Sequence, residues 1–197
     1  MPGTLREPGT SESWCLAPAE RVPGTAFEST AVVYAAAVDT YLAIASRREV
    51  RDYADTPLPD DVVHRILDAG RLSGSSRNAQ GWEFVVVGDK NAMADCVYAP
   101  ENVRGAALVV AIAGSARAFD TGRAAQNMLL AGWNDGVGSC PNGIRDAEGV
   151  ARLVGAPVSI VLSFGYPAKP RDPESRSAEE WSARANRKPF DDVVRRV

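Results

Sequence analysis

Two basic segments carry side chains that could bind an anionic ligand. Residues 46–51 contain Arg47, Arg48 and Arg51, and the forked donors of three nearby arginines suit a phosphate group. A second basic segment, Arg187-Lys188-Pro189, lies near the C-terminus. A solvated charge run is the simpler interpretation of each segment taken alone, so neither predicts a site without further support.

Two glycine-containing segments could approach a flat ring. Ser75, Asn78 and Gln80 lie in a polar loop before a predicted strand, where short amides and hydroxyls could contact the edge of a heterocycle. In the turn from 136 to 143, glycines would let backbone N–H groups come close to a ligand. This turn lacks the G-x-G-x-x-G pattern, so a Rossmann site is not supported. Each segment alone could also be an ordinary loop.

The single histidine, His64, restricts the possible chemistry. A histidine-rich metal site cannot be assembled within one chain, and we expect no metal. A Ser-His-Asp or Cys-His centre would have to use His64 itself. Its apolar neighbours repeat at helical spacing, so a position on a helix face is the simpler interpretation. Chemistry supplied by a cofactor is therefore favoured.

Composition indicates a globular protein of one domain. The 197 residues are 45% apolar and 24% charged, with a net charge of −3, and nothing suggests a nucleic-acid or membrane surface. Three cysteines do not form a disulfide framework, which favours a reducing compartment. No stretch is long and apolar enough for a membrane span, and no secretory signal is visible. We therefore expect a cytoplasmic location.

The expected elements alternate between helical and extended patterns. Residues 1–30 are rich in Pro, Gly, Ser and Thr and are interpreted as a mobile extension, whereas residues 31–197 form the folded domain with a C-terminal arm. The pattern predicts helices at 33–47, 60–72, 120–135 and 146–154, a short helix near 89, and strands at 82–87, 106–113 and 158–164. The strand at 106–113 is continuously apolar, which indicates burial on both faces. The order indicates an α+β or three-layer fold.

The order and spacing of these segments resemble the nitroreductase family of FMN enzymes over residues 38–197. A typical member has a helix ending R-R-S-x-R, a P-x-P stretch, a loop P-S-x-x-N-x-Q-P-W, a helix with D-x-x-x-A-x-Q-N-x-x-L-A, and then G-x-G-S, G-Y-P and R-K-P. The matching residues here are Arg47 to Arg51, Pro57 to Pro59, Gly74 to Trp82, Asp120 to Ala131, Gly136 to Ser139, Gly165 to Pro167 and Arg187 to Pro189.

The resemblance implies a fold, an assembly and a set of cofactor contacts. The fold would be a three-layer α+β sandwich with a central mixed sheet flanked by helices, in an intertwined homodimer with two FMN sites at its interface. The phosphate and ribityl end of FMN would be held by Arg47, Arg48, Arg51 and Arg187. Along the flavin would lie Ser75, Asn78 and Gln80, with backbone groups of Pro141, Asn142 and Gly143 beside the ring. These residues would come partly from different subunits.

The chain departs from the family pattern at three places. Glu49 replaces the usual small hydroxyl residue in the phosphate-binding turn, which puts FMN affinity in question. Gly74 and Gly81 stand where prolines are common. The stretch from Ala113 to Asp120 is short, where larger relatives insert helices over the substrate, so the substrate pocket is left undefined.

The resemblance implies an FMN-dependent oxidoreductase. NADH or NADPH would donate hydride to the flavin and then leave, and a small acceptor such as a nitroaromatic or quinone would follow in ping-pong order. No side chain stands out as a required acid or base, because the flavin supplies the chemistry. One alternative is a flavin-dependent dehydrogenase or oxidase of a cyclic dipeptide or azoline-type product. Another is a non-catalytic flavin-binding protein, suggested by Glu49.

Overall fold

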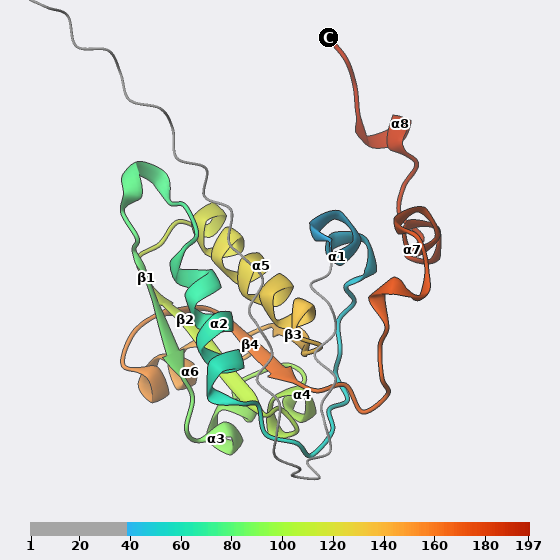
Figure 1. The fold of residues 1–197 in the computed structure, drawn as a ribbon. Helices are drawn as coiled ribbons and strands as arrows, with labels where there is room; N and C mark the ends of the chain where they lie inside the picture. The colour runs from blue at the N-terminus through green and yellow to red at the C-terminus, as the bar shows by residue number, and fades with distance from the viewer. Residues whose placement is uncertain (1–38) are drawn as a thin grey trace, which may run out of the picture. The chain divides into compact units, whose positions relative to one another are not determined.

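The computed structural model of the protein describes residues 39–197 (Figure 1). The predicted extension at 1–30 and the start of the predicted first helix lie outside the described residues. Within them, four strands form one sheet in the order β1-β2-β4-β3. The strands are β1 (Trp82–Val86), β2 (Leu108–Gly114), β3 (Gly138–Asn142) and β4 (Val158–Gly165).

The sheet is built around its two central strands, β2 and β4. Every β2 residue except the last is buried, as the continuous apolar run predicted. β2 pairs with β4 in an antiparallel register that sets Val110 opposite Leu162. The other two strand pairings are also antiparallel. The sheet was expected to mix parallel and antiparallel pairs. Among the described residues, the parallel pairing consists of one isolated bridge, between Glu49 and Ser139.

Helices cover both faces of the sheet and make the three layers that the resemblance implied. On one face lie α2 (Asp60–Arg71) and α5 (Ala118–Asn134), which pack on each other and on alternate β2 residues such as Val110 and Ile112. The other face carries a second core of Met93, Val97, Val103, Val109 and Val150. Those side chains come from β2, from the turn after α3, and from the helices α3 (Lys90–Ala94), α4 (Pro100–Arg104) and α6 (Ala147–Val154).

The helix boundaries follow local signals in the sequence. Asp60 and Asp61 lie in the first turn of α2, where acidic side chains favour the positive helix end. α6 ends at Gly155, which adopts the left-handed conformation (φ 82°) expected of a C-terminal cap. The pattern did not predict α4, whose five residues are too few to show a helical period.

The glycine-rich segment from 136 to 143 is an edge strand over most of its length, so its interpretation as a turn was wrong. Only Gly136 has a turn conformation, with a φ of 74°. From Gly138 to Asn142 the chain pairs with β4 as strand β3. Pro141 is tolerated there because an edge strand does not need every backbone N–H for pairing.

The C-terminal arm is partly helical. It holds a 3-10 turn (Pro173–Ser175), α7 (Ala178–Arg184) and α8 (Phe190–Val193). α7 begins with a capping box formed by Ser177 and Glu180 and packs against α1 (Thr40–Ser46). In the described part of the chain, no helix has both the length and the apolar character needed to cross a membrane.

Candidate functional site

The segment that follows α1 lies along the edge strand β3. The Val50 amide donates a hydrogen bond to the Ser139 carbonyl at 3.0 Å, and the buried Val50 side chain rests over Gly138. A Cβ added at Gly138 would lie 2.7 Å from Val50, so only glycine allows this approach. The sequence therefore fixes Arg47, Glu49 and Arg51 beside β3.

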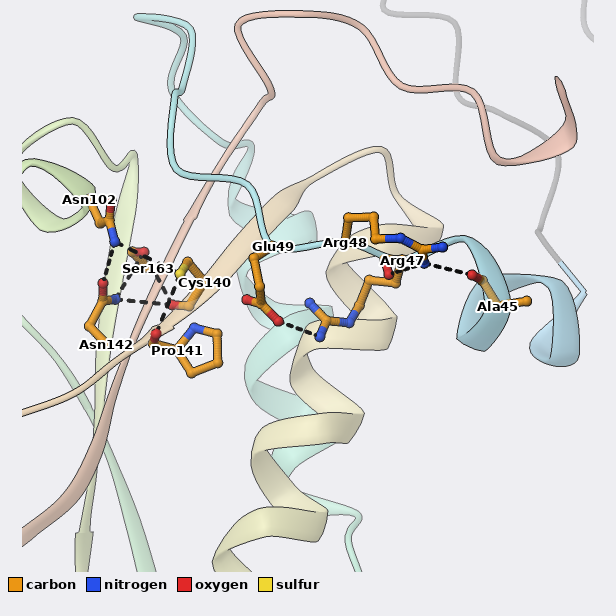
Figure 2. A network of polar contacts seen from close by, with 9 residues as sticks. All are labelled: Ala45, Arg47, Arg48, Glu49, Asn102, Cys140, Pro141, Asn142 and Ser163. Atoms are coloured by element: carbon orange, nitrogen blue, oxygen red, sulfur yellow. Dashed lines mark hydrogen bonds and ion pairs between the residues drawn. The ribbon is translucent and has the colours of Figure 1, made fainter. Parts of the chain in front are cut away.

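Within this segment, Glu49 pairs with Arg47 rather than with a following arginine. The two side chains form an ion pair at 2.8 Å (Figure 2). The pair is largely enclosed, with side-chain exposures of 12% for Arg47 and 33% for Glu49. Even so, Arg47 Nη1 and Glu49 Oε2 are buried without a hydrogen-bond partner among the described residues. Leaving a buried cationic donor without a hydrogen-bond partner costs free energy, so this position suits an anionic ligand.

Arg48 attaches the C-terminal arm to α1. Its guanidinium donates to the carbonyls of Ala45 (2.7 Å), Arg47 (2.8 Å) and Trp181 (2.7 Å), and it lies 5.6 Å from the centre of the Trp181 ring. Burial lowers the pKa of Arg48, and the neighbouring cations Arg187, Arg47 and Arg184 lower it further. Basic side chains from the end of α1 and from the C-terminal arm, including Arg187, therefore lie near one another here.

Two basic residues that the sequence reasoning missed extend this cluster. Lys169 and Arg171 line a cavity of about 240 Å³ together with Glu49, Arg51 and Pro167. They follow the Gly165-Tyr166-Pro167 motif directly, in the stretch Lys169-Pro170-Arg171. The K-P-R spacing after that motif was the signal that could have identified them. The three cations outnumber the two carboxylates, Glu49 and Asp52, that also line this cavity, so the net positive charge would attract a phosphate group.

The end of β3 is held by a buried network of polar side chains (Figure 2). The Asn142 amide donates to the Cys140 carbonyl (3.0 Å), the Ser163 hydroxyl (3.1 Å) and the Val161 carbonyl (3.4 Å). Its oxygen accepts a hydrogen bond from Asn102 of α4 at 3.1 Å. Because the side chain is fully engaged in the core, it is not available to a ligand.

The titratable groups beneath β3 are neutral. Burial raises the pKa of the Tyr53 phenol, and its hydrogen bond with Ser163 (3.0 Å) offsets only part of that effect. Burial, followed by the nearby Glu49 carboxylate, raises the pKa of the Cys140 thiol. A buried phenol and a buried thiol of this kind are poor acids, bases and nucleophiles at neutral pH. Tyr53 and Cys140 therefore supply no acid-base chemistry here.

The polar loop with Ser75, Asn78 and Gln80 adopts an unusual backbone. Both Asn78 and Gln80 have positive φ values, 55° and 48°. The Ser75 hydroxyl accepts the Gln80 amide at 2.9 Å, which fixes the loop. The chain is closely packed at Gly81, where an added Cβ would lie 3.1 Å from the Ala116 nitrogen.

The structure does not bring this loop to the arginine cluster within one chain. Ser76 donates its amide to Asp120 in the first turn of α5, whereas Ser46, beside the arginines, accepts a hydrogen bond from Trp133 near the last turn. At about 1.5 Å of rise per residue, these contacts lie about 20 Å apart along α5. Figure 1 shows the loop and α1 near opposite ends of that helix.

His64 is exposed on α2, as expected for a helix-face residue. Over residues 39–197, no group of three His, Cys, Asp or Glu side chains is placed to hold a metal ion.

Comparison with protein families gives a match to the model of the Nitroreductase family. The match covers residues 44–115 and 101–166, which together are more than half of the chain. A protein of Methanothermobacter thermautotrophicus, assigned as a NADH dehydrogenase/NAD(P)H nitroreductase, is 28% identical in an alignment of 172 positions that covers 73% of this chain and 88% of that protein.

Solved structures with the same fold include two informative neighbours. One is a protein of Bacteroides thetaiotaomicron assigned as a NADH dehydrogenase/NAD(P)H nitroreductase, with 26% identity and a TM-score of 0.63 over 73% of this chain and 95% of that chain. The other is NADPH:FMN oxidoreductase from Vibrio harveyi complexed with NAD+, with 23% identity and a TM-score of 0.62 over 68% and 71%. The second likeness shows a shared fold.

Proposed function

Because the chain belongs to the nitroreductase family, we propose that it is an FMN-dependent oxidoreductase. It takes hydride from NADH or NADPH and reduces a small acceptor, such as a nitroaromatic or a quinone, in ping-pong order. The observation that carries the proposal is the set of cations beside β3, where Arg47 has a buried donor without a partner and Arg51 shares a cavity with Lys169 and Arg171.

The residues present fit the phosphate end of FMN. Arg47, Arg51, Lys169 and Arg171 would bind the phosphate, and Arg48 would hold α7 and thereby Arg187 close by. The donors of Arg48 already bind carbonyl groups, so its proposed role in FMN binding is to hold α7 in place and not to contact the phosphate. The cations would neutralise the phosphate and fix its position.

The ring end is provided by backbone groups and by the polar loop. Pro141, Asn142 and Gly143 at the end of β3 would lie beside the ring, with Ser75, Asn78 and Gln80 along it. When bound, FMN supplies the hydride chemistry. The protein contributes position: the Asn102–Asn142–Ser163 network holds the β3 backbone, and the neutral Tyr53 and Cys140 leave no competing base beneath it.

Cofactor content tests this proposal directly. The purified protein is expected to be yellow and to release FMN, not FAD, on denaturation, because the cationic site is placed for a terminal phosphate and the chain has no adenine-binding motif. A colourless protein that leaves the fluorescence of added FMN unchanged would contradict the assignment.

The two described cysteines, Cys96 and Cys140, are buried free thiols, which supports the proposed cytoplasmic location.

We further propose that the active form is a homodimer. The loop at Ser75 and the cluster at Arg47 occupy opposite ends of α5, so a second chain is needed to bring such groups together around one FMN. The exposed apolar side chains of the arm, Phe190 and Val193, lack a core of their own. Light scattering at low micromolar concentration is expected to give the mass of two chains. A monomer that retains FMN would contradict this prediction.

Glu49→Ser is expected to tighten FMN binding about threefold to tenfold. Glu49 lines the cavity proposed for the phosphate and occupies one donor of Arg47. Removing the carboxylate relieves a like-charge repulsion on the order of 1–2 kcal/mol and releases Arg47, and about 1.4 kcal/mol corresponds to a factor of ten. Titration of apo-protein with FMN measures the effect, and the gain should shrink at high salt. An equal or weaker affinity at low salt would show that Glu49 does not oppose the phosphate.

A second candidate function is the flavin-dependent dehydrogenation of a bulky product such as a cyclic dipeptide. It is favoured by the short connection between β2 and α5, which consists only of Ser115, Ala116 and Arg117. No inserted helix covers the site at this position. Turnover with oxygen as the final acceptor and without nicotinamide would favour this function over the first.

A further inference from the structure

A second cationic cavity lies beside the polar loop, at the end of α5 opposite the arginine cluster. Its volume is about 300 Å³, and its lining includes Ser76, Arg77, Ser115, Arg117 and Asp120. Arg77 and Arg117 have neither an ion pair nor a side-chain hydrogen bond within residues 39–197, in contrast to arginines such as Arg48, Arg65 and Arg104. Two exposed guanidinium groups without partners are therefore available at this cavity.

The backbone holds Arg77 in place at a conformational cost. Its φ is 55°, in the left-handed region that arginine seldom adopts. The neighbouring contacts enforce this geometry: Ser76 donates to the Asp120 carboxylate at 3.2 Å, and Ser115 donates to the Gly81 carbonyl at 2.8 Å. Strained backbone that the surroundings keep in place is concentrated at ligand-binding sites.

The charge of the cavity favours an anion. Asp120 is 5% exposed, accepts the Ser76 amide and lies in the first turn of α5, where the helix end favours negative charge. Arg117 is the N-cap of α5 and provides no side-chain cap, so the first amides of this 17-residue helix are open at the same place. The two arginines outnumber the single carboxylate of Asp120, which is buried and already accepts a hydrogen bond. The surface of the cavity is therefore positive.

We propose that this cavity binds the negatively charged group of the electron acceptor, so the preferred acceptors are aromatic carboxylates. This inference rests on the proposed function, because the cavity adjoins the loop expected to lie along the flavin. Arg77 occupies a variable position of the P-S-x-x-N-x-Q-P-W pattern, so it can set the specificity of this chain. A volume of about 300 Å³ is at the lower limit for small-molecule sites and suits a single ring rather than a dinucleotide.

Matched ligands that differ only in charge test the proposal. The oxidised holoenzyme is titrated calorimetrically with 4-nitrobenzoate and with the neutral 4-nitrobenzamide. The wild type is expected to bind the carboxylate at least tenfold more tightly. Arg77→Gln with Arg117→Gln should remove this preference and change the affinity for the amide less than twofold. The control is Arg152→Gln on α6, which removes another exposed charge elsewhere. It should leave both affinities unchanged.

Three results would overturn the proposal. In the first, the wild type binds the two ligands with equal affinity. In the second, the Arg152 variant loses as much carboxylate affinity as the double variant does. In the third, the double variant shows a raised KM for the nicotinamide while its kcat/KM for 4-nitrobenzoate does not fall. The last would assign the arginines to the electron donor. Because calorimetry needs no turnover, a holoenzyme that binds the carboxylate through these arginines but reduces nothing would contradict the proposed function and leave the anion site supported.

Discussion

Replacing Lys169 and Arg171 together with glutamine is expected to weaken FMN binding about 100-fold. Each side chain would contribute a charge-assisted hydrogen bond to the phosphate, and such bonds stabilise by about 1.5–3 kcal/mol. Both residues are exposed, so the lower value applies, which is about a factor of ten for each. Arg51 would remain in the cavity and keep part of the affinity.

Fluorescence titration of apo-protein with FMN measures this loss. The matched control is Arg195→Gln with Arg196→Gln, which removes two exposed charges after α8 without touching the cavity. The control should bind FMN within twofold of the wild type. A Lys169/Arg171 variant with the affinity of the wild type would show that this cavity does not hold the phosphate.

The Asn142→Ala variant is expected to lose about 3 kcal/mol of unfolding free energy. The Asn142 side chain is 2% exposed and makes its hydrogen bonds inside the core. Its removal leaves the buried Asn102 amide without this acceptor, at a cost of about 1–3 kcal/mol, and also removes the packing and hydrogen bonds of the Asn142 amide; the Cys140 carbonyl keeps its bond from the Ser163 hydroxyl. The β3 backbone would also lose its brace beside the proposed ring site, so FMN affinity should fall with stability.

Urea denaturation followed by circular dichroism gives the free energy of unfolding. Asn91→Ala is the control, because Asn91 is an exposed asparagine in the short helix α3. It should change the stability by less than about 0.5 kcal/mol, as surface substitutions commonly do. A loss below about 1 kcal/mol for Asn142→Ala would mean that water or a shifted neighbour replaces the network.

Elements with a clear hydrophobic period were predicted well from the sequence. α2 and α6 begin and end within a residue or so of the expected positions, because acidic first turns and Gly155 mark their ends. The buried run of β2 identified a central strand. These features depend on local composition and burial alone, which the sequence displays directly.

β3 was missed because its pairing depends on tertiary contacts. Gly138, Ser139 and Pro141 have low strand propensity, and the segment is extended because β4 pairs with it on one side and the Val50 segment covers the other. Strand propensity yields to such context. The same limitation applies to the Asn102–Asn142 contact, which joins residues 40 positions apart, and to Lys169 and Arg171, whose cavity includes residues from both ends of the domain.

The proposed function requires that this chain pass electrons from a reduced nicotinamide to a bound flavin. Anaerobic stopped-flow mixing of the FMN-loaded protein with NADH, and separately with NADPH, tests it most directly. We predict that the flavin absorbance near 450 nm bleaches at a rate that saturates with at least one nicotinamide, and that a nitroaromatic added afterwards restores the absorbance. A flavin that stays oxidised with both nicotinamides would contradict the account.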